Sequence, residues 1–357
     1  MGRSRTWIGA LVAGVSTSLV AAAGAGAKTI HVEPGEDTLQ EAIDAAEPGD
    51  KLLLHSGLYT LSKTVVIDKS LIIRGRSERA ADVHIAAVAA EDFDFDFGNP
   101  LFADPIKDVG HLLFVTGGAQ RVILGHFTIK GAPPNPLLEV DEGPCTEPPP
   151  AGLGLNLTEC FGDAIHSDGA ADLEVKFVQA SLNAGNGVFV AGAKKALIRY
   201  VRATNNGAFG VDVDTADRLS IRHSVFIANQ VSGVEASGHE PGLHRDEYFA
   251  EVDMHDVVAK ANGEIGIEIE RYRKARLRDL TCADNREDGF DADRVSEVDL
   301  EDSEFVNNLD DGIEMFPVDV EPGEQPFDFP GSTIYDFDDL EFSGNVGEDI
   351  RLAPTEN

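Results

Sequence analysis

The sequence predicts an all-β fold, a single-stranded, right-handed parallel β-helix (a solenoid) with three short strands in each 23-residue coil. A glycine-led segment recurs at a constant step, beginning at Gly187, Gly210 and Gly233 and, past an inserted 10-residue loop, at Gly266, Gly289 and Gly312. Apolar residues alternate with polar ones after each glycine, and an asparagine follows at a fixed distance from it. A fixed period of this kind indicates a solenoid of stacked coils.

The first strand of each coil follows the repeating position. Residues one and three positions later are mostly apolar, and this period of two is typical of a strand with one buried face. The frame extends back to Ala164 and, past a second and longer insertion, forward to Asp349. The first inward positions are Ile165, Val188, Val211, Val234, Ile267, Phe290, Ile313 and Ile350.

Two further strands complete each coil. The second has apolar residues nine and eleven positions after the repeating one, as at Leu219 and Ile221, and the third carries Phe226 and Cys282. The asparagines then form a column in which neighbouring amides lie about 4.8 Å apart and hydrogen-bond along the stack. We expect this column to be structural; its members are Asn183, Asn206, Asn229, Asn262, Asn285, Asn308 and Asn345.

The N-terminal part has a different pattern. Residues 29–32 read as a strand and residues 37–43 as an amphipathic helix capped by Asp37, followed by strands at 52–54, 64–67 and 71–73. An open stack of strands needs a cover over its first coil. We expect the helix to provide it.

Residues 1–27 have the parts of an export signal: basic residues, an apolar run over 7–20 and a small-residue cleavage site ending at Ala27. We expect residues 28–357 to be one β-helix domain, exported to the periplasm or beyond, with inserted loops at about 133–161, 238–248 and 317–333. The apolar run is shorter than a membrane span needs. An uncleaved start-transfer helix is the alternative, and no later segment reads as a span.

Three cysteines bear on the compartment. Cys145 and Cys160 bracket a proline-rich stretch, and we expect them to form a disulfide in an oxidising compartment. Cys282 falls in a core column and is expected to stay a buried thiol. No cysteine or histidine cluster has the spacing of zinc ligands.

The charge balance limits the partners. The chain has 29 Lys and Arg against 63 Asp and Glu, a net charge of -34. This excess of acid argues against nucleic acid or an anionic membrane as partner and fits cations, neutral sugars or a salty medium. We expect a monomer that uses no organic cofactor.

Acidic residues gather on the outward face of the first strand. Carboxylates at coil spacing, about 4.8 Å, repel one another, and Ca²⁺, which takes six to eight oxygen ligands, would relieve the repulsion. The alternative is a solvated acidic face. The candidate calcium ligands are Asp212, Glu235, Glu268, Asp291 and Glu314 in one column and Asp214, Glu270 and Asp293 in the next.

The repeat and the entry segment resemble the pectin-lyase-like superfamily of right-handed β-helix proteins. In addition, Asp288-Gly289 and Asp310-Asp311-Gly312 are similar to motifs of polygalacturonase-type glycoside hydrolases. That resemblance implies that Asp288, Asp310 and Asp311 protonate the leaving oxygen and activate water. The family's His-Gly and Arg-x-Lys motifs are missing, since the next coil reads Gly347-Glu-Asp-Ile-Arg. Asp-Gly is also common in turns.

Elimination or epimerisation of uronate sugars needs a base and a cation or arginine at the sugar carboxylate. Arg271 and Arg294 follow the acidic columns and are candidates, although such arginines commonly form plain ion pairs. The candidate substrate-binding residues are His166, Phe189 and Arg351 on the outward column, with His244, Arg245 and Tyr248 in an inserted loop. Loops on a rigid scaffold carry binding functions, so these insertions are expected to wall a groove.

The sequence therefore predicts an exported β-helix that binds and processes a polysaccharide on its acidic face, by hydrolysis or by elimination or epimerisation of uronates. A non-catalytic envelope protein that binds glycan or calcium is the alternative. Fold alone does not decide between them.

Overall fold

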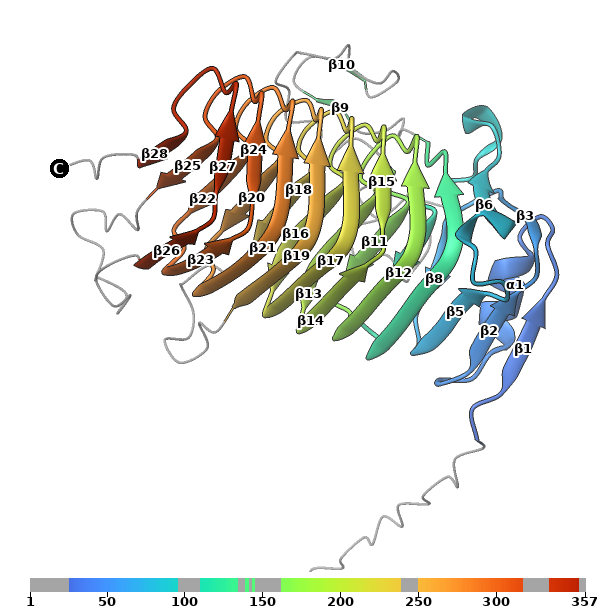
Figure 1. Ribbon diagram of the computed structural model, residues 1–357. Coiled ribbons are helices and arrows are strands. Elements are labelled where there is room, and N and C mark those ends of the chain that lie inside the picture. Colours follow the sequence, from blue (N-terminus) through green and yellow to red (C-terminus); the bar gives the residue numbers. More distant parts are fainter. Residues whose placement is uncertain are drawn as a thin grey trace, which may run out of the picture.

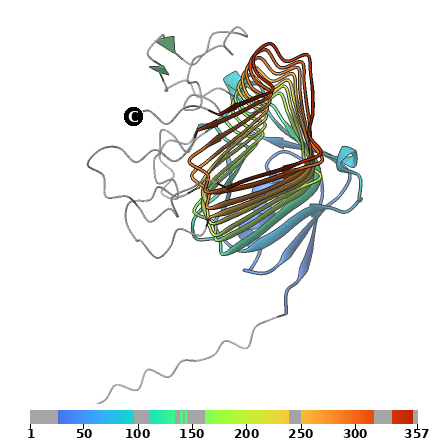
Figure 2. The ribbon, with the colours of Figure 1, turned by 60° about the vertical axis from the view of Figure 1, so that its left-hand side comes forward.

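The computed structural model describes residues 26–95, 110–133, 162–238, 250–316 and 334–352, and the backbone of 139–140 and 143–144. Its parallel strands lie side by side along one axis, each paired with strands one coil away (Figure 1). Turned by 60°, the coils are seen stacked over one another around a common interior (Figure 2). The prediction of a mainly β fold with long parallel sheets is confirmed.

One parallel sheet carries the predicted first strands. Within the described residues it has ten members: β4 (Val65–Ile67), β7 (Leu113–Val115), β11 (Ile165–Asp168), β13 (Val188–Ala193), β16 (Val211–Ala216), β18 (Val234–Ser237), β20 (Ile267–Glu270), β22 (Phe290–Asp293), β25 (Ile313–Phe316) and β28 (Ile350–Leu352).

The other parallel sheet wraps the rest of each coil. Its sixteen described members are β1 (Thr29–Val32), β2 (Lys51–Leu54), β3 (Gly57–Leu61), β5 (Leu71–Gly75), β6 (Val83–Ala87), β8 (Arg121–Lys130), β12 (Asp172–Ser181), β14 (Lys195–Arg199), β15 (Arg202–Thr204), β17 (Arg218–Ile227), β19 (Glu251–Lys260), β21 (Lys274–Ala283), β23 (Glu297–Glu301), β24 (Glu304–Val306), β26 (Ile334–Asp338) and β27 (Glu341–Ser343).

The remaining described elements are short. Strands β9 (Glu139–Val140) and β10 (Gly143–Pro144) pair antiparallel, and the helical elements are α1 (Thr38–Ala45), η1 (Ala80–Asp82) and η2 (Ala90–Asp92). Among the described residues, no helix has the length and apolarity that crossing a bilayer requires.

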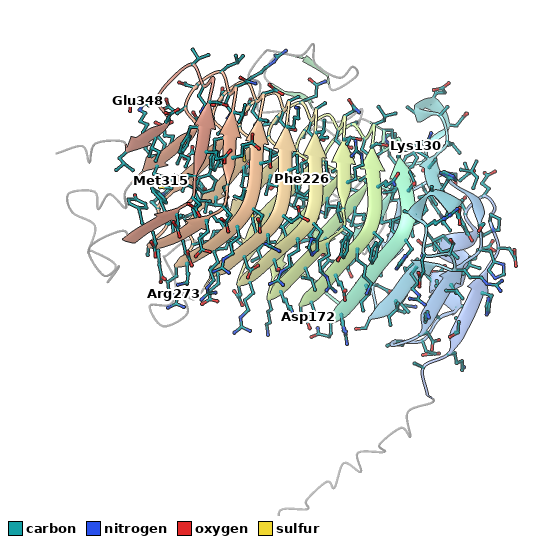
Figure 3. The ribbon with its side chains drawn as sticks, in the orientation of Figure 1. Lys130, Asp172, Phe226, Arg273, Met315 and Glu348 are labelled. Carbon is teal, nitrogen blue, oxygen red and sulfur yellow. The ribbon has the colours of Figure 1, made fainter. Side chains whose placement is uncertain are left out.

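The register of the ten-stranded sheet follows the repeat. Ile165 pairs with Val188 and Val188 with Val211, each one coil away, while Val234 pairs with Ile267 across the 10-residue insertion. These inward side chains are fully buried. Figure 3 shows the contrast between the buried Phe226 of the interior and the exposed Arg273 at the edge.

The second and third predicted strands merge in several coils. Strands β12, β17, β19 and β21 each run for ten residues and bend at a residue with positive φ, which is 53° at Phe177 and 50° at His223. In other coils the two strands stay separate, as β14 and β15 do. The strand count per coil therefore varies along the stack.

The asparagine column forms as predicted. Each side-chain amide donates to the amide oxygen one coil on, from Asn183 to Asn206 (2.9 Å) through to Asn308 to Asn345 (3.2 Å). The same oxygens accept the backbone N–H of the preceding member, as Asn285 does from Asn262 (3.1 Å). This column holds successive coils in register.

The N-terminal helix covers the first coil and has Asp37 at its N-cap position, but the predicted capping hydrogen bond does not form. Leu39 and Ile43 of α1 are fully buried in the hydrophobic core. Asp37 has a φ of 53° and makes no capping hydrogen bond. Its carboxylate instead accepts hydrogen bonds from the Ser62 backbone N–H (2.9 Å) and the Ser62 hydroxyl (2.5 Å), because Ser62 lies beside it on the next coil.

Cys282 is a buried free thiol, as expected. The proposed signal sequence lies almost entirely outside the described residues, since the description begins at residue 26. The cysteine pair Cys145 and Cys160 and most of the three inserted loops also lie outside them.

Candidate functional site

The outward side chains of the ten-stranded sheet form one continuous column. Each member pairs with the same position of the next strand, so neighbours follow one another at strand spacing, about 4.8 Å. We call the five consecutive carboxylates the acidic ladder: Asp212, Glu235, Glu268, Asp291 and Glu314. Phe189 and His166 continue the column at one end and Arg351 at the other.

Burial and mutual repulsion keep protons on the acidic ladder. Burial first, and the neighbouring carboxylates second, raise the pKa of Glu235 to about 7 and that of Glu268 to about 8. The same causes, in the same order, raise the pKa of Asp291 to about 7 and that of Asp212 well above its usual value. Protons held by these carboxyls therefore lower the charge of the column near neutral pH.

The second acidic column is joined to the two predicted arginines. Arg271 Nη2 lies 2.7 Å from Glu270 Oε2, and Arg294 Nη2 lies 2.8 Å from Asp293 Oδ2 and 3.7 Å from Glu270 Oε1. Asp214 pairs with Ser237 in this column, and Ser237 in turn with Glu270. The arginines follow β20 and β22, whereas Asp288 precedes β22. The two arginines are therefore held in ion pairs at the opposite end of the strands from the predicted catalytic aspartates.

A carboxylate cluster lies at the C-terminal end of the acidic ladder. One oxygen each of Asp288, Asp311 and Glu314 lies within 4.8 Å of the others. Arg351 Nη1 is 3.0 Å from Glu314 Oε1 and 3.6 Å from Asp311 Oδ2. Asp311 Oδ2 is buried, and no described group hydrogen-bonds to it. Asp310, the third predicted catalytic residue, is exposed.

Asp288 and Asp311 also have a structural role. Asp288 Oδ1 accepts the backbone N–H of Asp311 (2.8 Å), and Asp311 Oδ1 accepts that of Glu348, which Figure 3 shows at the C-terminal end of the stack. Burial raises the pKa of Asp288 to about 7; the hydrogen bond from Asp311 opposes this rise, and the carboxylates of Glu314, Asp310 and Asp311 add to it.

A second cluster lies at the N-terminal end of the outward column. His166 Nδ1 is 2.8 Å from Asp163 Oδ2, and His111 Nδ1 is 3.3 Å from the same oxygen. The His111 and His166 rings stack with centroids 3.9 Å apart, and Phe189 stacks on the other face of His166 at 4.5 Å. Asp163 Oδ1 accepts the backbone N–H of Asn186 at 2.6 Å.

Burial and the close contact between the carboxylate and the imidazoles set the ionisation of this cluster. Burial disfavours the charged form of Asp163, but the two imidazoles beside it, His111 and His166, outweigh that effect and lower the Asp163 pKa to about 2. Burial, followed by the nearby His111, lowers the pKa of His166 to about 4 against the opposing effect of Asp163. At neutral pH the pair is an ionised carboxylate beside a neutral imidazole.

Residues 154–249 match a family model described as the right handed beta helix region. The chain contains a right-handed β-helix. Similar solved structures include a PL6 family alginate lyase (13% identity, TM-score 0.48) and the A-module of a mannuronan C-5 epimerase from Azotobacter vinelandii (11%, 0.46). A polygalacturonase from Erwinia carotovora ssp. carotovora gives 12% and 0.43.

Each of these three alignments covers 92% of this chain. The chain spans 38% of the alginate lyase, 97% of the epimerase module and 96% of the polygalacturonase. No curated protein sequence gives a significant match.

In this β-helix, the predicted site residues fall on one face but not in one centre. The structure joins Asp288, Asp311, Glu314 and Arg351, and separately joins His166 to Phe189. The predicted loop residues His244, Arg245 and Tyr248 lie outside the described residues. His111 and Asp163 were not predicted, although each stands three residues before an outward residue, as Asp288 and Asp311 do.

Proposed function

We propose that the chain is exported after removal of residues 1–27, binds a polysaccharide along the outward column and hydrolyses it at Asp288 and Glu314. One observation carries the proposal. The Asp288 carboxyl, whose pKa burial raises to about 7, has an oxygen within 4.8 Å of a Glu314 oxygen, and Glu314 is ion-paired with Arg351. Glycoside hydrolysis uses such a pair, one carboxyl with a proton to donate and one to act as base.

The two carboxyls take different roles. Asp288 donates its proton to the leaving glycosidic oxygen, and Glu314 removes a proton from the attacking water. Arg351 favours the ionised form of Glu314 by its positive charge, although burial leaves the Glu314 pKa above its usual value. Asp311 lies against both groups and positions them.

The rest of the outward column suits a long, neutral sugar chain. Its protonated and ionised carboxyls offer both donors and acceptors to sugar hydroxyls, and Phe189 and His166 add apolar surface at one end. A uronate chain would be repelled by the acidic ladder. Elimination or epimerisation of uronates therefore needs Ca²⁺ bound there, for which the ladder offers oxygen ligands.

The alternative is a non-catalytic protein that binds glycan or calcium at the cell envelope. It is favoured by the hydrogen bonds that Asp288 and Asp311 make to the next coil, because these give both aspartates a purpose without catalysis.

The test is a screen for products from neutral and uronate polysaccharides, with and without Ca²⁺. We expect release of reducing ends from a neutral glycan, and a loss of about 100-fold or more in Asp288→Asn and Glu314→Gln, the range for a missing acid or base. Asp302→Asn, an exposed aspartate in the next turn of the same coil, is the matched control and should keep full activity.

The opposite results point elsewhere. Absence of product from every glycan, together with stabilisation by Ca²⁺, would support the non-catalytic alternative. Full activity of Asp288→Asn would exclude Asp288 as the acid.

The role of Asp288 as the general acid also predicts how the rate depends on pH. Because Asp288 must be protonated, we expect kcat/KM to fall as the pH rises through about 7. A rate that climbs steadily from pH 6 to pH 9 would rule out this role for Asp288.

A further inference from the structure

We propose that His111, Asp163 and His166 form a binding site for a divalent transition-metal ion, separate from the acidic ladder. Two imidazoles and one carboxylate are a common ligand set for Zn²⁺ and other first-row metals. One ligand atom from each of the three side chains lies within 4.8 Å of the others. His111 and Asp163 are each only 3% exposed, so the site is built into the wall of the coil.

The spacing of the three donors fits an ion. The Asp163 Oδ2 atom lies 2.8 Å from His166 Nδ1 and 3.3 Å from His111 Nδ1. Ligand bonds of about 2.0–2.2 Å at tetrahedral or octahedral angles place neighbouring donors about 2.8–3.6 Å apart. An ion among the three therefore needs only small movements of the side chains.

Without an ion, the three groups satisfy one another. The Asp163 backbone N–H donates to His111 Nδ1 (3.0 Å), and His166 Nδ1 donates to the Asp163 carboxylate. Metal binding would turn His111 Nδ1 from that N–H toward the ion and move the His166 proton from Nδ1 to Nε2. No proton is lost to solvent in that step, because neutral imidazole has two tautomers.

The surroundings hold the donors in place. Asn186 fixes the second oxygen of Asp163 through its backbone N–H, and the ring of His166 is clamped between His111 and Phe189. Groups that orient the ligands in this way raise metal affinity.

The donor types predict which ion binds. Imidazole nitrogens favour Zn²⁺ and Co²⁺, whereas Ca²⁺ prefers oxygen ligands alone. The cluster of Asp288, Asp311 and Glu314 in the same chain serves as a comparison, because it offers only oxygen ligands. We expect Zn²⁺ and Co²⁺ at the histidine cluster.

The experiment is a titration of chelator-treated, full-length chain with Zn²⁺ by calorimetry and with Co²⁺ by visible absorption. Another histidine pair, His31 and His55, lies 2.9 Å apart and exposed, so all variants are made in a His55→Ala background. His166→Phe removes a metal ligand but keeps the column of rings, because the two neighbours of His166 in that column, Phe114 and Phe189, are themselves phenylalanines.

We expect one Zn²⁺ per chain, with affinity at least about tenfold weaker in His166→Phe and unchanged in the matched control Asp288→Asn. Co²⁺ should give absorption bands of nitrogen and oxygen coordination that His166→Phe abolishes. Asp163→Asn, which keeps an oxygen for the Asn186 N–H, serves as a second variant, and circular dichroism confirms that each variant is folded.

Two results would overturn the proposal. One is the absence of Zn²⁺ and Co²⁺ binding in the folded His55→Ala chain. The other is equal affinity in the parent, His166→Phe and Asp163→Asn, which would assign the ion to other residues. Both leave the proposed hydrolysis untouched, because the catalytic residues belong to the other cluster.

Discussion

Carboxyl groups of the acidic ladder change their charge at an unusual pH. Burial raises the pKa of Glu268 from its usual 4.5 to about 8, with Glu235 and Asp291 adding to the effect. A raised pKa in the folded state means that folding is favoured while the group is protonated. This contribution is fully present below about pH 4.5 and is lost as the pH rises through about 8.

We therefore expect the melting temperature to fall between pH 5 and pH 9. Glu268→Gln removes the ionisation, so its melting temperature should fall less over that range and exceed that of the parent at pH 9. Glu304→Gln, at an exposed site, is the control. Parallel curves for the parent and Glu268→Gln would show that Glu268 titrates normally.

The residues missed by sequence analysis were missed for a physical reason. His111 and Asp163 stand 52 residues apart because the coil between them includes a long insertion, so the 23-residue frame did not reach His111. A search for metal-ligand spacing along the sequence also misses this cluster, because the stacking of coils, not closeness in sequence, brings its residues together. A polar residue three positions before an outward one, as in Asp163 and His166 or Asp288 and Asp291, was the available signal.

At the scale of the elements, side-chain periodicity predicted the strand faces and their register. Each inward position repeats in every coil, so a wrong assignment of the buried face at Val211 would also have been wrong at Val234 and Ile267. The bends were not predictable in the same way. Phe177 and His223 adopt positive φ, which is uncommon for such residues, and local propensity does not signal it. Asp37 was a plausible cap by type, but a contact with Ser62 on the next coil took its carboxylate.

The asparagine column gives the prediction at this scale. Asn262 is 1% exposed and accepts hydrogen bonds from the backbone N–H and the side-chain amide of Asn229. Asn262→Ala removes the acceptor of both hydrogen bonds and leaves the Asn229 amide only its bond to the Ala203 carbonyl oxygen (3.3 Å), which we expect to lower the free energy of unfolding by about 2–5 kcal/mol. Urea unfolding measures it.

The control for that experiment is Gln179→Ala, at an exposed position of β12, which should change the free energy little. If both variants unfold at the same urea concentration as the parent, the column contributes no net stability.

For the whole molecule, the net charge of -34 is the main electrostatic influence on stability. Like charges at this density repel within a fold that is held together by neighbour-to-neighbour contacts. Salt shortens the range of the repulsion to about 10 Å at 0.1 M.

We expect the melting temperature to rise as NaCl increases from 0.01 M to 0.3 M, a range in which screening dominates over salting-out effects. Differential scanning calorimetry at pH 7 measures it, with an equally concentrated neutral osmolyte as the control. A melting temperature that is flat in NaCl would show that bound protons and ion pairs already neutralise the repulsion.

The separation of the two side-chain clusters sets a length scale on this surface. From Asp163 to Asp288 there are five coil steps, about 24 Å at the spacing of paired strands. A short oligosaccharide can reach one cluster only, whereas a polymer lying along the sheet reaches both. A ligand bound at the histidine cluster would then contact the carboxylate cluster only if its sugar chain is long enough to bridge the two. The protein would therefore distinguish its ligands by length.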